Sequence, residues 1–356
     1  MHNNNIETKT PFTFTLPEEL SAKEPPELRG INRDHVKLLV INRTNGETSH
    51  SMFYHLSDFL KKGDLLVFNS SRTLPASLKT VNNKDQINLE IRLAEHLPDD
   101  SWLALLLDQE TKSTDREVKA GLKMEFDLGL KAVIIKRDKR NPQLWKIKFS
   151  ETGTELINLF YQIGNPIRYR YVSERFPLEY YQTVYAKDPG SSEMPSAGRA
   201  FTWKMLFDLK RKGIDTAYLS LHTGLSSYMD DEVDALHLAS EEEYFIPEAT
   251  ADRIKNTKAG GGRIIAVGTT VVRALESAVN DIREVTSGHH YTTKRITEEH
   301  TLMIADGLIT GLHEPRASHL DLLSAFLKPI QIKAAYEEAI AKKYLWHEFG
   351  DLNLIL

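Results

Sequence analysis

The sequence of 356 residues contains no cysteine. This absence excludes disulfide bonds, thiolate zinc sites and cysteine nucleophiles. No stretch is long and apolar enough to cross a bilayer, and the polar N-terminal segment MHNNNIETKTP lacks the apolar core of a signal peptide. We therefore expect a cytoplasmic protein with no membrane partner, long enough for two domains and a substantial core.

Several common catalytic motifs are also missing. The chain has no P-loop, no GxGxxG fingerprint and no GxSxG nucleophile elbow. His222, His237 and His313 are far apart in the sequence and lack the i, i+4 spacing of a helical zinc site. The sequence therefore gives no support for a metal site.

Charge is the next constraint. The formal net charge of −5 argues against a protein wrapped in nucleic acid, but it allows a local basic face. Residues 131–148 form the densest basic segment, and Arg168, Arg170 and Arg175 form a second cluster among aromatic residues. Such mixtures suit phosphate contact and base stacking, although a solvated strand face with core aromatics explains them at least as simply.

The pattern of apolar and polar residues changes twice along the chain. Residues 77–150 contain short apolar runs separated by polar turns, which is typical of a small antiparallel barrel or sandwich. Before and after this segment, strand patterns alternate with helical patterns, which indicates an α/β layer architecture. We predict a main α/β domain built from residues 1–76 and 151–356, with an inserted antiparallel β-barrel domain at 77–150.

The segment RIIAVGTTVVRALES, residues 263–277, predicts a buried strand that turns through Gly268 into a helix. Thr269 and Thr270 are suitable N-caps, and the helix start offers N–H groups for a carboxylate or phosphate. Arg273 and Glu276 lie one turn apart, so they either bracket a ligand or pair with each other. Strand–glycine–helix corners also occur in most α/β proteins without any ligand.

Two predicted loops have compositions that are typical of functional sites. Residues 189–201 are rich in small residues and precede a helical pattern. In residues 221–232, His222 follows a strand pattern and Gly224 begins a turn. A histidine at a strand end beside such a turn can act as acid, base or ligand contact, and a packed structural histidine is an equally good interpretation.

Taken together, these segments resemble the S-adenosylmethionine:tRNA ribosyltransferase-isomerase family of queuosine biosynthesis. The resemblance rests on an ordered set of strings over nearly the whole chain: GDLLVFNSSRTLPASL (63–78), YYQTVYAKDPGSSEMPSAGRAFT (180–202), YLSLHTGLSSY (218–228), HLASEEEYFIP (237–247), RIIAVGTTVVRALES (263–277), LLSAF (322–326) and the C-terminal KYLWHEFGDLNLI. It implies an α/β domain with an inserted β-barrel. It also implies transfer of the ribosyl part of S-adenosylmethionine to 7-aminomethyl-7-deazaguanine in the tRNA anticodon region, which gives epoxyqueuosine.

The resemblance implies roles for particular residues. S-adenosylmethionine is a cosubstrate, no cofactor is bound permanently, and we expect a monomer. The reaction needs proton transfer and an anion site for the methionine carboxylate. His222 and His313 are candidates for proton transfer, and Glu242 and Asp351 for anchoring an amine or orienting a histidine. The candidates for binding S-adenosylmethionine are Gly268, Thr269, Thr270, Arg273, Gly224 and Arg72.

The chain departs from the family pattern at polar positions. Ala200 and Ser240 stand where the pattern has histidine, Gly311 where it has asparagine, and Glu314 where it has an apolar residue. Three interpretations stay open: the family enzyme with a modified site, an enzyme for another adenosyl or nucleoside substrate, and a non-catalytic tRNA- or nucleoside-binding paralogue. The departures predict weak standard activity unless the neighbouring charges, Arg199 and Glu314, compensate.

Overall fold

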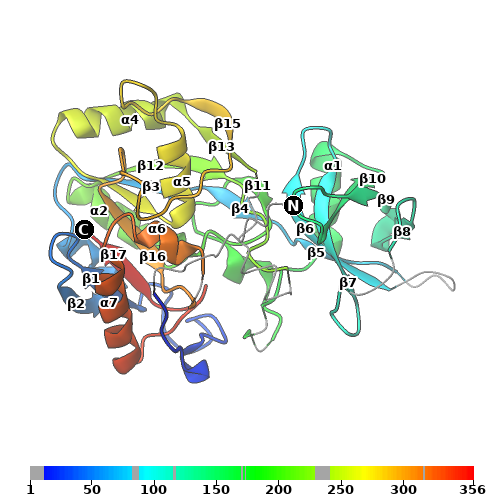
Figure 1. Cartoon of the computed structure of the whole chain (residues 1–356), viewed down its shortest axis with the longest axis horizontal. Coiled ribbons are helices and arrows are strands. Elements are labelled where there is room, and N and C mark those ends of the chain that lie inside the picture. The colour runs from blue at the N-terminus through cyan, green and yellow to red at the C-terminus, as the bar shows by residue number, and fades with distance from the viewer. Residues whose placement is uncertain are drawn as a thin grey trace, which may run out of the picture.

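Two β-sheets organise the computed structural model, which describes residues 12–81, 88–114, 118–169, 171–172, 174–228, 241–315 and 317–356. Figure 1 shows the larger sheet with its helices on one side of the molecule and the smaller sheet on the other, with a short ladder between them. Within these ranges, no helix has the length and apolarity needed to cross a bilayer.

The main sheet is mixed. From one edge to the other, its strands are β15 (Gly288–Thr292), β13 (Glu242–Ile246), β12 (Asp215–Leu221), β3 (Leu65–Asn69), β14 (Ile264–Val267), β16 (Gly307–Gly311), β17 (Leu352–Ile355), β1 (Lys37–Ile41) and β2 (Thr48–Met52). The central strands β12, β3, β14 and β16 run parallel. Antiparallel pairs flank them on both sides. The predicted α/β class is therefore confirmed.

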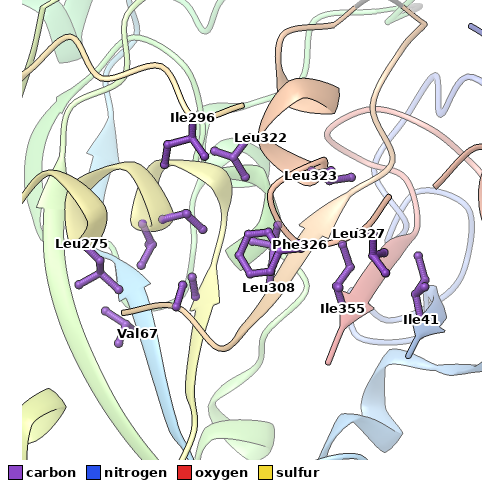
Figure 2. Close-up of a cluster of buried hydrophobic side chains, with 14 of the residues drawn as sticks. Ile41, Val67, Leu275, Ile296, Leu308, Leu322, Leu323, Phe326, Leu327 and Ile355 are labelled. Carbon is purple, nitrogen blue, oxygen red and sulfur yellow. The ribbon is translucent and has the colours of Figure 1, made fainter. Parts of the chain in front are cut away.

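Helices cover both faces of this sheet because its central strands are apolar on both sides. Leu65 and Val67 of β3 face one core, whereas Leu66 and Phe68 face the other, as expected for strands that are buried on both faces. The helices that cover the first face are α4 (Glu248–Ala259), α5 (Thr269–Ser277), α6 (His319–Leu323) and α7 (Pro329–Ala341). Helix α2 (Trp203–Arg211) covers the second. Figure 2 shows the first core, to which Leu275, Leu308 and Phe326 belong.

The smaller sheet is antiparallel throughout. Its strands follow the order β5 (Ser77–Lys79), β6 (Leu89–His96), β7 (Trp102–Asp108), β10 (Leu144–Phe149), β9 (Lys131–Arg137) and β8 (Lys123–Glu125). Helix α1 (Gly153–Ile163) packs on its core through Leu156 and Phe160. Between its two edges, the Val81 N–H donates to the Glu125 carbonyl at 2.9 Å. The sheet is a half-barrel, and the predicted separate, inserted β-barrel domain is not confirmed.

The ladder between the sheets pairs β4 (Ser71–Thr73) with β11 (Asp188–Ser191) in parallel. Short 3-10 helices span Glu18–Leu20, Phe53–Asp58, Asp127–Gly129, Leu178–Tyr181 and Ser196–Gly198. Strand β4 closely follows the carboxyl end of β3 along the chain. The ladder therefore lies between the main sheet and the smaller sheet (Figure 1).

Candidate active site

The carboxyl ends of the parallel strands place most of the predicted site residues along one edge. His222 follows β12, Gly268 follows β14, and His313 lies two residues beyond β16. Ligands of open α/β sheets bind outside this edge. The sequence could indicate each strand end, but only the sheet order brings the ends together.

Asn69, at the end of β3, forms hydrogen bonds to the segments of Ser71, Leu221 and Thr270. The sequence analysis missed this residue. Its side chain is 1% exposed. Its Oδ1 accepts the N–H groups of Ser71 and Leu221, each at 3.0 Å. Its Nδ2 donates to the Leu221 carbonyl at 2.9 Å and to Thr270 Oγ1 at 3.3 Å. The only sequence signal is a polar residue directly after a buried apolar run.

His222 is held in one orientation by the β4–β11 ladder. Its Nδ1 lies 2.8 Å from Ser71 Oγ, which lies 2.6 Å from Ser191 Oγ. Gly190 packs so closely on the imidazole that a Cβ there would overlap the ring. Burial lowers the pKa of His222. The imidazole is therefore neutral at neutral pH, and Nε2 has no hydrogen-bond partner among the residues that the structure describes.

A cavity of about 190 Å³ lies beside His222, between the two sheets. Ala94, Trp102 and Leu156, on the smaller sheet and α1, contribute an apolar wall. The main sheet and strand β11 of the ladder contribute a polar wall, which contains Gly190, His222, Gly224, Glu241, Glu242 and Glu243. An apolar wall facing a few polar groups is typical of a small-molecule site. We call this space the His222 cavity.

Three predicted residues meet in the polar wall. Glu242, 8% exposed, forms an ion pair with Arg273 of α5. Its carboxylate also accepts the N–H of Gly224. Burial raises the pKa of Glu242, and the positive charge of Arg273 opposes that rise. The ion pair therefore ties α5 to the wall of the cavity.

The alternative pairing of Arg273 with Glu276 is wrong. Glu276 is 1% exposed, and its carboxylate accepts backbone N–H groups at 2.9 to 3.1 Å from Met303, Ile304 and Ala305. The two residues leave α5 in different directions, one towards the cavity and the other into the protein.

The glycine corner forms as predicted, but its cap differs. Gly268 has φ of 102°, a value that favours glycine, and is itself the N-cap of α5. Thr269 and Thr270 are the first residues of the helix, so the prediction that they cap it is wrong. The cause is the left-handed turn at Gly268, whose carbonyl already accepts the N–H of Val271 at 3.1 Å.

Comparisons with known proteins identify the family of this chain. A model of the queuosine biosynthesis protein family matches residues 9–355. The chain belongs to this family. The S-adenosylmethionine:tRNA ribosyltransferase-isomerase of Carboxydothermus hydrogenoformans is 35% identical over 348 residues, which are 97% of this chain and 98% of that protein. A protein of the same name from Flavobacterium psychrophilum is 33% identical over 353 residues, which are 97% of this chain and 99% of that protein.

A solved structure also matches over the full length. The crystal structure of S-adenosylmethionine tRNA ribosyltransferase from Thermotoga maritima is 29% identical, with a TM-score of 0.53, and covers 97% of this chain and 100% of its own. The resemblance inferred from the sequence strings is confirmed.

Two residues predicted for catalysis in this queuosine biosynthesis protein lie away from the His222 cavity. His313 stacks on His319 with ring centroids 4.4 Å apart, and its Nε2 lies 2.9 Å from Thr310 Oγ1. Burial brings the pKa of His313 well below its ordinary value. Strands β3 and β14 lie between β16, which precedes His313, and β12, which precedes His222. At the usual strand spacing, β16 and β12 are about 14 Å apart. The carboxylate of Asp351 accepts the N–H groups of Lys37 at 2.6 Å and Leu345 at 2.7 Å.

Arg72, predicted to bind S-adenosylmethionine, also points elsewhere. Neighbouring side chains of a strand alternate between faces, and Ser71 is the residue that faces His222. The Arg72 guanidinium instead lies over the Tyr161 ring, 5.3 Å from its centroid, and the side chain is exposed.

The departures from the family pattern gather in a second, smaller space. A pocket of about 10 Å³ is lined by Arg33, Ser196, Arg199, Ala200, Gly311, His347 and Glu348, among others. We call it the Glu348 pocket. Its volume suffices for about one water molecule. Ser240, the remaining departure, and His237 lie outside the described residues.

The two charges considered as compensation form ion pairs, Arg199 in the interior and Glu314 at the surface. Arg199 donates to Glu27 and to the Tyr180 carbonyl, each at 2.7 Å. Glu314 Oε1 lies 3.1 Å from His347 Nδ1. Neither side chain lines the His222 cavity.

The Glu348 pocket also carries titratable groups that the sequence analysis missed. Burial raises the pKa of Glu348 to about 7, and Tyr171 donates a hydrogen bond to its Oε2. Burial lowers the pKa of His347 to about 4. The His347 ring stacks on Tyr171 at 3.6 Å. Only the fold could reveal this cluster, because Tyr171 is 177 positions away from Glu348 in the sequence. No group of histidine, aspartate and glutamate that could hold a metal ion occurs in the described ranges.

Proposed function

We propose that this queuosine biosynthesis protein is an S-adenosylmethionine:tRNA ribosyltransferase-isomerase. It transfers the ribosyl part of S-adenosylmethionine to 7-aminomethyl-7-deazaguanine in tRNA and forms epoxyqueuosine, while adenine and methionine leave. Relatives named for this activity match over 97% of the chain. The observation that carries the proposal is a neutral, oriented histidine in a cavity between the two sheets.

We assign His222 as the group that accepts the proton next to the sulfonium. A general base must be deprotonated at the working pH and held within reach of the proton. Burial lowers the pKa of His222, and Ser71 fixes its Nδ1. Nε2 is then the nitrogen that acts. His313 and Asp351, which are engaged elsewhere, are positioning residues in this assignment.

The charges of the cavity suit a cationic substrate. Glu95, Glu241 and Glu243 line it, and both the sulfonium of S-adenosylmethionine and the amine of the acceptor base carry positive charge. Arg140 pairs with Glu95 at 3.1 Å and lies 3.8 Å from Glu241, so the negative charge is only partly neutralised. Glu242, held by Arg273 and Gly224, forms a fixed part of the cavity wall.

We place the methionine carboxylate at the start of α5. The first N–H groups of a helix have no partner within the helix and favour an anion. At Gly268, Thr269 and Thr270 this helix start opens on the carboxyl edge of the sheet. Thr270 connects it through Asn69 to Leu221, the residue before His222.

The remaining organisation follows from the same proposal. We propose that residues 77–150 act as an inserted β-barrel domain that covers the cavity, with residues 1–76 and 151–356 as the main domain. The hydrogen bond between the edges of the smaller sheet supports this division. The core of that sheet also takes in Leu156 and Phe160 of α1, beyond these bounds. We also propose that the enzyme acts in the cytoplasm as a monomer on the anticodon region of tRNA.

The departures that lie in the described residues do not favour a different substrate. Arg199, Ala200, Gly311 and Glu314 lie at the Glu348 pocket or pair into it, not at the His222 cavity. We therefore propose that standard activity is retained, in contrast to the weak activity that the sequence alone predicts.

The test is incubation with S-adenosylmethionine and tRNA that carries 7-aminomethyl-7-deazaguanine, beside the Carboxydothermus hydrogenoformans relative. The proposal predicts adenine and epoxyqueuosine in equal amounts, at rates within about tenfold of the relative. A tRNA with guanine at the same position is the control and should release no adenine. Failure to form adenine under conditions in which the relative does so would overturn the proposal.

A further inference from the structure

Three strands at one edge of the main sheet, β12, β13 and β15, carry a row of side chains that begins at His222 (Figure 1). The His222 N–H donates to the Glu243 carbonyl at 3.1 Å, so the antiparallel pairing of β12 with β13 continues to these two residues. In the next antiparallel pairing, Glu243 lies opposite Tyr291. Residues directly opposite each other point to the same face of a sheet. His222, Glu243 and Tyr291 therefore form one row across three strands, about 10 Å long at the usual strand spacing.

Two contacts extend this row along β13 and β15. Phe245 lies opposite His289, and their rings stack with centroids 4.4 Å apart. His289 Nδ1 lies 3.5 Å from Glu243 Oε1. His289 and Tyr291 are exposed, whereas Glu243 and Phe245 are half-buried. We call the surface formed by Glu243, Phe245, His289 and Tyr291 the Tyr291 shelf.

The shelf is the solvent face of this edge, and it adjoins the His222 cavity. The residues that alternate with it on β13, Tyr244 and Ile246, belong to the first core on the opposite face. Glu243 is part of the shelf and also lines the cavity. The shelf therefore continues the polar wall of the cavity outwards to the surface.

Glu243 is the cavity carboxylate best able to take a cation from a ligand. Its side chain is 35% exposed, and its distance of 3.5 Å to His289 is longer than the about 2.7 to 2.9 Å of a strong charge-assisted hydrogen bond. Glu242, by contrast, is paired with Arg273. Glu95 is paired with Arg140 at 3.1 Å. Glu243 thus combines negative charge, access from the cavity and weak engagement within the protein.

We infer that the Tyr291 shelf holds the acceptor base of the tRNA, with the ring of 7-aminomethyl-7-deazaguanine stacked on Tyr291 and its ammonium group at Glu243. This inference rests on the proposed function. A base that reacts must leave the RNA stack and enter the site, and an exposed aromatic ring on a sheet is a common platform for an unstacked base. A carboxylate beside that ring repels phosphates but attracts a cationic base. The combination fits this base better than an ordinary nucleotide.

The position of the shelf also suits a base that is still attached to RNA. Glu243 and His222 are on neighbouring strands, about 5 Å apart at the usual spacing, so an amine at Glu243 reaches the cavity in which His222 acts. Tyr291 is one strand further out, at the exposed edge of the sheet. The base therefore lies across the mouth of the cavity, with its amine inwards and its ribose and phosphates towards solvent.

The experiment measures the affinity of fluorescein-labelled tRNA by anisotropy, with either 7-aminomethyl-7-deazaguanine or guanine at the acceptor position. The wild type should prefer the modified tRNA by about tenfold or more, as a charge-assisted hydrogen bond provides. Glu243→Gln should reduce this preference to about twofold. It should also bind guanine tRNA slightly more tightly, because a negative charge facing the RNA is removed. Tyr291→Leu should weaken binding of the modified tRNA about tenfold through loss of stacking.

The matched controls are Phe207→Leu and Glu298→Gln, at an exposed aromatic residue and an exposed carboxylate outside the shelf. Each should keep both tRNA affinities within twofold of the wild type. A wild type that binds the two tRNAs equally would overturn the inference. Wild-type preference in Glu243→Gln together with wild-type affinity in Tyr291→Leu would overturn it as well. Melting temperatures verify folding, and either shelf variant tests the inference if the other is unstable.

Turnover separates failure of the shelf from failure of the proposed function. We expect both shelf variants to raise KM for the modified tRNA about tenfold and to bind S-adenosylmethionine within twofold of the wild type in calorimetry. Loss of S-adenosylmethionine binding in Glu243→Gln would assign this carboxylate to the sulfonium and overturn the shelf. A wild type that prefers the modified tRNA but releases no adenine with it would overturn the proposed function and not the shelf.

Discussion

The His222 cavity and the Glu348 pocket contain the same pair of groups under different constraints. Each has a histidine whose pKa is lowered by burial and a carboxyl group whose pKa is raised by burial. The cavity measures about 190 Å³ and the pocket about 10 Å³. His347 is stacked on Tyr171 and bonded at both ring nitrogens, whereas His222 is held at Nδ1 alone.

This difference shows that a shifted pKa is not sufficient to locate catalysis. Structural clusters shift pKa values as strongly as active sites do. What distinguishes His222 is an adjoining space and one ring nitrogen left for a ligand. In our account the His222 cavity performs the chemistry. The Glu348 pocket stabilises the C-terminal region beside Ala200 and Gly311, where the sequence departs from the family pattern.

The largest expected effect comes from Gly190→Ala in the His222 cavity. The added Cβ would overlap the His222 ring and force it to move. A displacement of about 1 Å can cost about a hundredfold in rate, so we expect kcat to fall by about that factor. Initial rates of adenine release measure the effect, and the melting temperature verifies folding. Wild-type turnover in this variant would show that the position of the ring is unimportant.

Arg273→Ala should destabilise the protein rather than only weaken ligand binding. It leaves Glu242 buried without its cation, and the free energy of unfolding should fall by about 2 kcal/mol. This value is below the range of about 3 to 5 kcal/mol for a fully buried pair, because the Arg273 side chain is 24% exposed. Urea unfolding should show a larger loss at pH 8 than at pH 5, where Glu242 is more readily protonated. Adding Glu242→Gln should recover most of the loss, and no recovery would exclude this explanation.

The Glu348 pocket should show two opposing pH dependences. Glu348 has a folded pKa of about 7 against an ordinary 4.5, so the stability that it contributes below pH 4.5 is lost as pH rises to 7. His347 has a folded pKa of about 4 against an ordinary 6.5, so stability is lost as pH falls from 6.5 to 4. In the wild type these slopes largely cancel.

Single variants should separate the two slopes. Glu348→Gln should leave stability rising with pH between 4 and 6.5, by up to about 1.4 kcal/mol per pH unit. His347→Asn should leave stability falling between pH 4.5 and 7. Asparagine suits this position because φ is 73°. Urea unfolding across this pH range measures both, and parallel curves for the two variants would contradict the assignment.

Gly311→Ala is the matched control for Gly190→Ala and should have the smallest effect. A Cβ at Gly311 would meet no atom within 4 Å. Alanine in a strand is more favourable than glycine by about 0.5 kcal/mol, so thermal unfolding should show a slight gain in stability. Turnover should stay within about twofold. A large loss of turnover would mean that the Glu348 pocket takes part in the reaction.

The sequence predicted what depends on local pattern. The apolar run Ile264–Val267 with a glycine after it predicted β14 and the start of α5, and the short runs between 77 and 150 predicted the strands of the smaller sheet. It failed where pairing is long-range. Asn69 forms hydrogen bonds to Leu221 and Thr270, which are 152 and 201 positions further along the chain. Arg273 forms an ion pair with Glu242 and not with Glu276 on its own helix. The closure of the half-barrel depends on contacts between its edge strands, which no local sequence pattern specifies.

The most direct test compares adenine release by the wild type, His222→Gln and His313→Gln with S-adenosylmethionine and tRNA carrying 7-aminomethyl-7-deazaguanine. Loss of a general base costs about 10² to 10⁴ in rate, so we predict at least a hundredfold loss for His222→Gln with S-adenosylmethionine binding retained. We predict that His313→Gln stays within tenfold of the wild type and instead lowers the melting temperature. Wild-type turnover by His222→Gln, or a greater loss in His313→Gln, would contradict the central claim that the His222 cavity is the catalytic site.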